Sequence, residues 1–181
     1  KGYYSYDLGN WHIIVLNTTK KFVPTAAGSA QEQWLRQDLA ANTKECVLAY
    51  WHAPMFFSSS SGGTFTDVPK AFWNALYEYG VEIVVNGNRH HYERFPRMNP
   101  NGQIDPAGIR QFIVGTGGKS KGSISTIHPL SEVRGRTYGV IKFTVHADRY
   151  DWEFISIPAE PFTDSGSESC HELGNNAPTA V

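Results

Sequence analysis

The chain has 181 residues, 16 basic and 17 acidic side chains, a formal net charge of −1, and 40% hydrophobic and 13% aromatic content. This length corresponds to one large domain, and the composition is sufficient for a hydrophobic core. The charges are dispersed and nearly balanced, which argues against a nucleic-acid-binding or membrane-surface protein. No apolar run approaches the ~20 residues that a membrane-spanning helix needs. We therefore expect neither nucleic acid nor a membrane as a partner.

Alternating segments in the first half of the chain predict a β-α-β-α-β unit. Strands are expected over residues 12–16, 45–51 and 81–86, which are rich in apolar side chains. A helix is expected over residues 29–41, which begin with the Ser-x-x-Glu pattern of a capping box. A second helix is expected over residues 67–79, between an Asp cap and a Gly stop. This order with short connections predicts a parallel sheet.

The second half of the chain has the pattern of antiparallel strands. Residues 109–115 predict one strand. Apolar and polar residues alternate in segments 141–145 and 150–154, on either side of a tight turn near Asp148. These two segments are expected to form a hairpin.

The last part of the chain is rich in Ser and Gly. We expect a main domain over residues 1–160, followed over residues 161–181 by a tail and the start of a linker to a possible further domain. The two cysteines, Cys46 and Cys170, permit one disulfide, which would hold this tail and indicate an oxidising compartment. Two unpaired thiols are the alternative.

Two histidines each follow a predicted strand. His52 comes directly after residues 45–51, and His90 follows residues 81–86 across a short turn. If these strands are parallel neighbours, both imidazoles emerge at the carboxyl edge of the sheet, where α/β proteins bind ligands. Neutral imidazole is the commonest protein metal ligand. The pair therefore predicts part of a metal site.

Six segments, which together cover nearly the whole chain, share their order and motifs with one known enzyme family: Tyr3–Asn10, Gln33–Leu39, Leu48–Pro54, Asn86–Phe95, Gly108–Gly118 and Thr163–His171. With them the chain resembles the C-terminal half of a calcineurin-like metallophosphoesterase, closest to secreted, bacterial-like purple acid phosphatases. The resemblance implies an α/β fold of the metallophosphoesterase αββα sandwich type. This chain would supply its C-terminal portion, a βαβαβ parallel unit followed by antiparallel strands.

The resemblance also implies a function, the acid-phosphatase-like hydrolysis of phosphate esters. In this family two metal ions, which can be Fe, Zn or Mn, stabilise the ester and supply a bound hydroxide. His52 and His90 match metal-ligating histidines of the family. Asn88 stands where the family's Gly-His-x-His motif has its first histidine, so it is the third candidate ligand. The alternative for Asn88 is a loop residue that tolerates left-handed backbone geometry.

The family's aspartate ligands and its Asn-His-Glu motif precede the part that this chain resembles. We therefore expect an incomplete site, completed by an N-terminal half of the same domain or by a second chain, and a phosphate-ester substrate. No residue is assigned a direct catalytic role. The alternative is a non-catalytic fragment or degenerate homologue that acts as an interaction module. A secreted or periplasmic location follows from the resemblance and the suspected disulfide.

The remaining charged and histidine residues are expected to be structural. Glu93 and Arg94 should form an ion pair that holds their loop, and His91 should point away from the metal site. Surface or packing roles are expected for the other histidines, which show no convergent partners in the sequence: His12, His128, His146 and His171.

Overall fold

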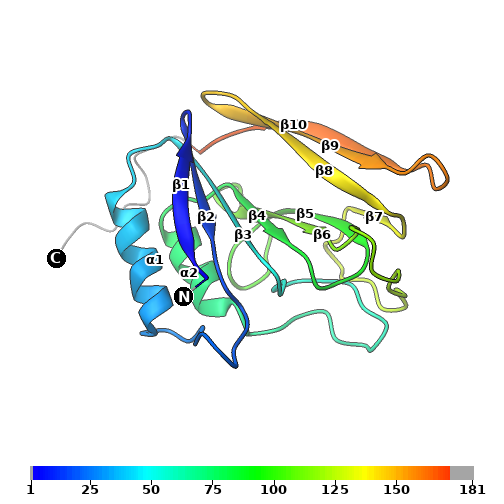
Figure 1. Cartoon of the computed structure of the whole chain (residues 1–181), viewed down its shortest axis with the longest axis horizontal. Helices are drawn as coiled ribbons and strands as arrows, with labels where there is room; N and C mark the ends of the chain where they lie inside the picture. Colours follow the sequence, from blue (N-terminus) through cyan, green and yellow to red (C-terminus); the bar gives the residue numbers. More distant parts are fainter. Residues whose placement is uncertain (1, 172–181) are drawn as a thin grey trace.

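A computed structural model of the chain describes residues 2–171 (Figure 1). Its helices are α1 (Ala30–Ala41) and α2 (Lys70–Glu78). Its strands are β1 (Tyr4–Leu8), β2 (Trp11–Val15), β3 (Cys46–Trp51), β4 (Ile83–Asn86), β5 (Tyr92–Met98), β6 (Ile109–Val114), β7 (Val133–Gly135), β8 (Gly139–Val145), β9 (Arg149–Ser156) and β10 (Thr163–Ser169). No helix in this described part is long and apolar enough to cross a membrane.

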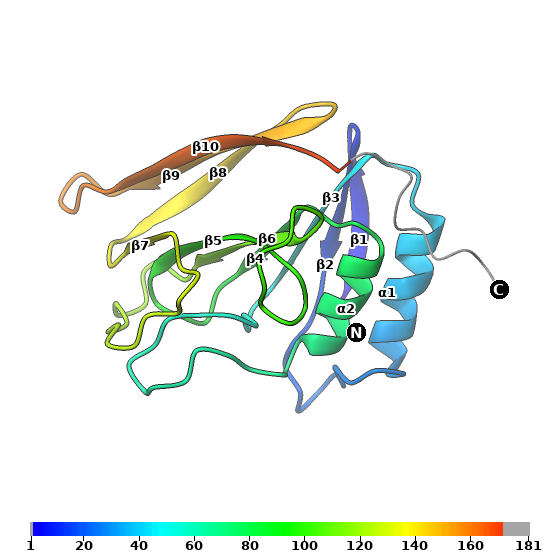
Figure 2. The ribbon, with the colours of Figure 1, turned by 180° about the vertical axis from the view of Figure 1, so that it is seen from behind.

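The strands form two sheets. The larger has seven strands in the order β1-β2-β3-β4-β6-β5-β7, and the smaller has three in the order β10-β9-β8. Strands β2, β3, β4 and β6 run parallel to one another, whereas β1, β5 and β7 pair antiparallel. Both helices lie on one face of the larger sheet, and the smaller sheet lies over the other face (Figures 1 and 2). The expected α/β fold, with a parallel unit followed by antiparallel strands, is confirmed.

Helix α1 begins where the capping pattern predicts. The Ser29 side chain accepts a hydrogen bond from the main-chain N–H of Glu32 at 3.3 Å. The Glu32 carboxylate accepts from the N–H of Gly28 at 3.0 Å rather than from the Ser29 N–H of a full capping box. Side chains therefore satisfy two N–H groups at the start of the helix, that of Gly28 before it and that of Glu32 in its first turn.

Helix α2 begins two residues later than the sequence predicts. Its first residue is Lys70, and Pro69 occupies the cap position without a side-chain hydrogen bond. Asp67 does not cap the helix: its main-chain oxygen accepts from the Lys70 N–H at 3.1 Å, and its carboxylate lies 3.5 Å from the Lys70 ammonium. A proline disfavours helical geometry at the residue before it, here Val68, which explains the later start.

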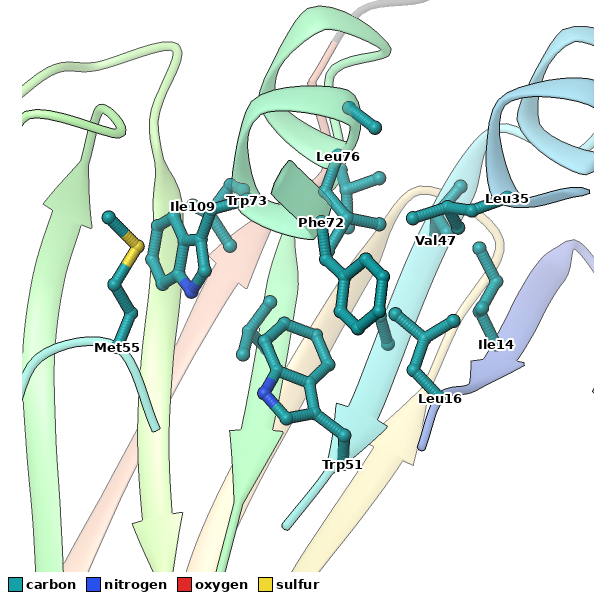
Figure 3. Close-up of a cluster of buried hydrophobic side chains, with 14 of the residues drawn as sticks. Ile14, Leu16, Leu35, Val47, Trp51, Met55, Phe72, Trp73, Leu76 and Ile109 are labelled. Carbon is teal, nitrogen blue, oxygen red and sulfur yellow. The ribbon is translucent and has the colours of Figure 1, made fainter. Parts of the chain in front are cut away.

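The main hydrophobic core lies between the two helices and the larger sheet (Figure 3). Side chains from each layer meet there, and each fully buried large apolar side chain contributes roughly 1.5–3 kcal/mol. This burial fixes the helices on the sheet and so fixes the loops that leave its carboxyl edge. The residues labelled in Figure 3 are Ile14, Leu16, Leu35, Val47, Trp51, Met55, Phe72, Trp73, Leu76 and Ile109.

A second core joins the two sheets. Tyr150 and Trp152 of β9 face the larger sheet, as the alternation predicts. The Trp152 ring lies 5.6 Å from that of Phe112, and the Tyr150 ring lies 5.8 Å from that of Trp11, both in edge-on geometry. The predicted hairpin is confirmed as β8 and β9, with Val145 paired to Tyr150.

The structure corrects the expectation of a tail from residue 161 onward. Residues 163–169 form β10, which pairs antiparallel with β9 along its whole length. Gly166 lies opposite Trp152, and a Cβ there would come within 2.3 Å of the indole. The small residues of this segment are therefore those of an edge strand that makes room for a large ring. The domain boundary at residue 160 remains a prediction, and the expected linker at 172–181 lies outside the described residues.

The predicted disulfide is confirmed. Cys46 at the start of β3 is bonded to Cys170, which follows β10, with a Cα–Cα distance of 5.6 Å. The bond spans 124 residues and ties the smaller sheet to the amino end of the larger one.

Strand β5 was not expected, and its position makes one ion-pair prediction wrong. Neighbouring residues of a strand point to opposite faces, so Glu93 and Arg94 cannot pair. Arg94 instead contacts Asp164, with its Nε 2.7 Å from the carboxylate, and also pairs with Glu132. The interruption of the β5–β6 pairing between Arg94 and Arg97, around a proline, explains why the sequence pattern of this strand is weak.

Candidate functional site

The carboxyl ends of β3 and β4 bring His52 next to the turn that carries the other candidate ligands. Trp51 pairs with Asn86 in parallel register, so the following residues, His52 and Gly87, are neighbours. The Gly87 N–H donates to the His52 main-chain oxygen at 3.1 Å. The His52 side chain is exposed, with its Nδ1 3.4 Å from where a Cβ of Gly87 would lie. The predicted meeting of the two strand ends is therefore present.

The turn after β4 is tight and projects Asn88 toward solvent. The Arg89 N–H donates to the Gly87 oxygen at 2.6 Å, and the His91 N–H donates to the Arg89 oxygen at 2.8 Å. Asn88 has a φ of 58°, the left-handed geometry that Asn tolerates better than most residues. Its side chain is exposed, as expected of either a loop residue or a ligand.

A polar hollow of about 170 Å³ contains Asn88 and His90. Gly122 closes one side, where its N–H donates to the His90 oxygen at 2.7 Å. His52 lies outside this hollow, on the neighbouring strand end. The structure thus brings Asn88 and His90 into one cavity and places His52 beside the turn that leads to them. The hollow is lined by Ser58, Ser59, Ser60, Asn88, Arg89, His90, His91, Gly122 and Ser123.

These donors fit part of a metal site. Two imidazoles and one amide oxygen are ligands that Fe, Zn and Mn accept. Within residues 2–171 there is no cluster of three or more His, Cys, Asp or Glu side chains that could hold an ion. His52, Asn88 and His90 offer three donors, which are too few to hold two ions, and their role as ligands remains a prediction.

A buried hydrogen-bond network lies directly behind His90. The Glu93 carboxylate is fully buried and accepts from the Ser58 N–H at 2.8 Å, from the hydroxyls of Ser58 and Ser131, and lies 3.0 Å from His91 Nε2. Burial raises the pKa of Glu93, but the hydrogen bonds from His91, Ser131 and Ser58 outweigh it and lower the pKa below its usual value. His91 also lines the hollow, and its Nε2 lies in this network, beside the Glu93 carboxylate. The network fixes the serine loop against the His90 turn.

No protein-family model matches the sequence. Purple acid phosphatase 22 of Arabidopsis thaliana is 32% identical over 145 residues, which cover 76% of this chain and 32% of the relative. Probable purple acid phosphatase 20 of the same plant is 29% identical over 164 residues, 83% of this chain and 37% of the relative. The solved structure of a purple acid phosphatase from yellow lupin seeds covers 92% of this chain with a TM-score of 0.82 at 20% identity. The chain is a relative of the purple acid phosphatases.

The resemblance expected from the sequence is thereby confirmed, and the matches are consistent with a C-terminal portion of such a protein. The chain spans only 32% and 37% of the two Arabidopsis purple acid phosphatases and 32% of the lupin chain. The structure of GAP50, described as the anchor in the inner membrane complex of Plasmodium, covers 94% of this chain and 54% of its own with a TM-score of 0.71 at 12% identity. The likeness to these solved structures shows the fold alone.

Arg89, which lines the hollow, was not predicted as a site residue. Arg89 occupies the variable position of the purple acid phosphatase Gly-His-x-His motif, so the motif gave no signal for it. Its guanidinium lies 3.5 Å from the centre of the Phe57 ring. Burial lowers its pKa, while the Glu93 carboxylate acts in the opposite direction. The sequence feature that could have indicated it is its position as a cation between the two candidate ligands Asn88 and His90.

A second cluster corrects the expectation that His12 has no convergent partners. His12 is buried, with Nδ1 2.8 Å from an Asp7 oxygen and Nε2 2.8 Å from an Asp38 oxygen. Ser5 donates to the other Asp38 oxygen at 2.7 Å. Asp7 is the cross-strand partner of His12 in the β1–β2 hairpin, so this contact follows from a register that the sequence alone did not define. The cluster joins α1 to the first hairpin.

The other three histidines also have specific partners. His146 lies 2.7 Å from Asp151, and His171 Nδ1 lies 2.9 Å from the main-chain oxygen of Gly80. His128 is buried and packs edge-on against an aromatic ring, that of Phe95. These contacts are structural, in agreement with the packing roles expected from the sequence.

Proposed function

We propose that this chain forms part of a metal-dependent phosphoesterase that hydrolyses phosphate esters. The observation that carries the proposal is the contact between His52 and Gly87, which unites the ends of two parallel strands at the edge where Asn88 and His90 lie. Relationship to the purple acid phosphatases supports the same chemistry. The parent activity is a proposal because the chain spans about a third of those relatives.

In this proposal His52 and His90 each hold a metal ion through an imidazole nitrogen, and Asn88 contributes its amide oxygen. The resemblance implies two ions, of Fe, Zn or Mn, whose chemistry is to stabilise the phosphate ester and to lower the pKa of a bound water. An amide oxygen is a weaker donor than imidazole, so the position served by Asn88 is the weaker one. The remaining ligands would come from an N-terminal half of the same domain or from a second chain.

The chain's own residues hold this edge in place. Gly87, which has no side chain, leaves room for the His52 ring, and the buried Glu93 carboxylate joins the serine loop to the His90 turn. Such supporting contacts orient metal ligands and affect metal affinity. The geometry of the site thus depends on buried groups behind it as much as on the donors themselves.

The Cys46–Cys170 disulfide supports a secreted or periplasmic location, because disulfides persist in oxidising compartments. A parent protein that is secreted and hydrolyses phosphate esters outside the cytosol accords with this bond. Detection of the mature protein outside the cytosol, with the bond oxidised, is the expected observation.

The test is hydrolysis of a chromogenic phosphate ester by the full-length protein, before and after reconstitution with Fe, Zn or Mn. Asn88→His restores an imidazole at the weak position and is expected to raise the metal-dependent rate. Asn101→His, at an exposed turn on another loop, is the matched control and should leave the rate unchanged. If neither the native protein nor Asn88→His hydrolyses the ester with any metal, the proposal fails and the non-catalytic alternative is favoured.

A further inference from the structure

Arg89 is a partly buried cation without a carboxylate partner. Among the described residues its guanidinium makes no ion pair within 4.0 Å, and its Nε is buried without a hydrogen-bond partner. The Phe57 ring beneath it, 3.5 Å from the guanidinium carbon, holds the group by a cation–π contact but accepts no hydrogen bond along its edge. The buried Nε is out of reach of a ligand, whereas the two terminal guanidinium nitrogens make no hydrogen bond with the described residues and remain available as donors.

The hollow beside Arg89 is lined by further donors. Ser59, Ser60 and Ser123 present hydroxyl groups, and those of Ser60 and Ser123 are without partners among the described residues. The main chain of Ser59 is fixed because its N–H donates to the Thr126 oxygen at 2.9 Å. The hollow is therefore rigid where Ser59 lies and offers neutral donors next to one cation.

The Glu93 carboxylate, which lies behind this hollow, is already engaged. Glu93 is fully buried behind it and is occupied by His91, Ser58 and Ser131. It does not lie within ion-pair distance of Arg89. The hollow thus presents an excess of positive charge and of hydrogen-bond donors, which is the requirement for an oxyanion site.

We propose that Arg89, together with the hydroxyls of Ser60 and Ser123, binds a phosphate-type dianion directly, without a metal ion between them. The two terminal nitrogens of the guanidinium can donate in parallel to two oxygens of a phosphoryl group. This inference rests on the proposed function for its choice of ligand, since the phosphoryl group of the substrate or the released orthophosphate is the dianion that reaches this edge. It assigns substrate binding to a residue beside Asn88, where the family's imidazole ligand is absent.

The test is calorimetric titration of the metal-free, full-length protein with inorganic orthophosphate, phenyl phosphate and sulfate. Arg89→Gln removes the charge, Arg89→Lys keeps the charge without the fork, and Arg149→Gln at an exposed position of β9 is the control. Arg89→Gln is expected to weaken orthophosphate binding at least about tenfold, with Arg89→Lys intermediate and Arg149→Gln unchanged. Thermal unfolding of each variant establishes that it is folded.

Tighter binding of phenyl phosphate than of orthophosphate identifies the substrate as the ligand, and the reverse identifies the product. Orthophosphate binding that is absent in the native protein, or equal in Arg89→Gln and Arg149→Gln, overturns the proposal. The ester-hydrolysis assay tests the proposed enzyme function independently of this binding measurement. Binding that depends on Arg89 without any hydrolysis supports the oxyanion site and contradicts the proposed enzyme function, so the two failures are distinguishable.

Discussion

The imidazole of His52 lies against Gly87, with its Nδ1 3.4 Å from the position that a Cβ on this glycine would occupy. The two residues are also joined by a main-chain hydrogen bond of 3.1 Å. Because β3 and β4 are parallel neighbours, the contact links the first candidate ligand to the turn that carries Asn88 and His90. A Cβ on residue 87 would be in contact with the His52 ring, so a larger side chain is expected to move the ring.

A branched side chain at position 87 is expected to displace His52. Gly87→Ala adds one methyl at ordinary contact distance from the imidazole, whereas Gly87→Val adds two further carbons beyond a Cβ that is already in contact. We expect Gly87→Val to weaken metal binding by about tenfold and Gly87→Ala to have a smaller effect. Metal affinity by competition with a chelator measures both variants. Equal affinity in the native protein and both variants would show that this contact does not position the ligand.

Removal of the disulfide should be strongly destabilising. Cys46 and Cys170 join positions 124 residues apart, and closing such a loop restricts the unfolded chain. The double variant Cys46→Ala, Cys170→Ala is expected to lose about 4 kcal/mol of unfolding free energy on the chain-entropy model. Guanidinium unfolding of both proteins, in the absence of reductant, gives the difference. A loss below about 1 kcal/mol would contradict this role of the bond.

Glu82 should make stability depend on pH near neutrality. It is buried beneath β3, where it accepts from the N–H groups of Val47 at 2.6 Å and His171 at 3.1 Å. Burial raises its pKa from the usual 4.5 to about 7, against the effect of these hydrogen bonds. Between these two values the carboxyl group ionises in the unfolded chain and stays protonated in the folded one.

It follows that the unfolding free energy falls as pH rises from about 5 to 7, by up to about 1.4 kcal/mol per pH unit. Glu82→Gln cannot ionise, so its unfolding free energy should lack this pH dependence. Any loss of hydrogen bonding in the variant lowers its stability equally at every pH. Urea unfolding at several pH values, with the native protein compared with Glu82→Gln, isolates the effect because both keep His171. Parallel pH profiles for the two proteins would be the contrary result.

The buried carboxylate behind His90 should be needed for stability. Glu93→Gln removes the charge that the Ser58, Ser131 and His91 donors share, and we expect a loss of about 2 kcal/mol. Glu153→Gln is the matched control, since its exposed carboxylate lies 4.0 Å from Lys142 and should change stability by less than about 0.5 kcal/mol. Urea unfolding compares them. Similar losses in both variants would argue against the network.

The parallel strands and the placement of His52 could be predicted because they depend on local signals. Apolar runs define β3 and β4, a capping pattern defines α1, and parallel pairing then places both strand ends at one edge. The disulfide could be predicted because the sequence has two cysteines, so Cys46 and Cys170 are the one possible pair. These features need no knowledge of distant contacts beyond the order of the elements.

The features that escaped prediction depend on tertiary contacts. Strand β5 contains charged residues and a proline, and its pairing with β6 and β7 determines its structure more than its own sequence does. Strand β10 is rich in small polar residues, with Gly166 lying against Trp152, so its composition resembles that of a tail. Arg89 meets the serine-lined hollow only in the folded chain, and its lack of a hydrogen-bond partner at Nε is likewise a property of the fold.

The most direct test of the central claim is the metal content of the full-length protein, purified without chelators or a histidine tag. Elemental analysis should compare the native protein with His52→Ala, His90→Ala and the control His146→Ala, whose ring contacts Asp151 on another hairpin. We expect bound Fe, Zn or Mn in the native protein and in His146→Ala, and a marked loss in the other two variants. No bound metal after incubation with each ion, or equal content in all four proteins, would contradict the assignment of His52 and His90 as ligands.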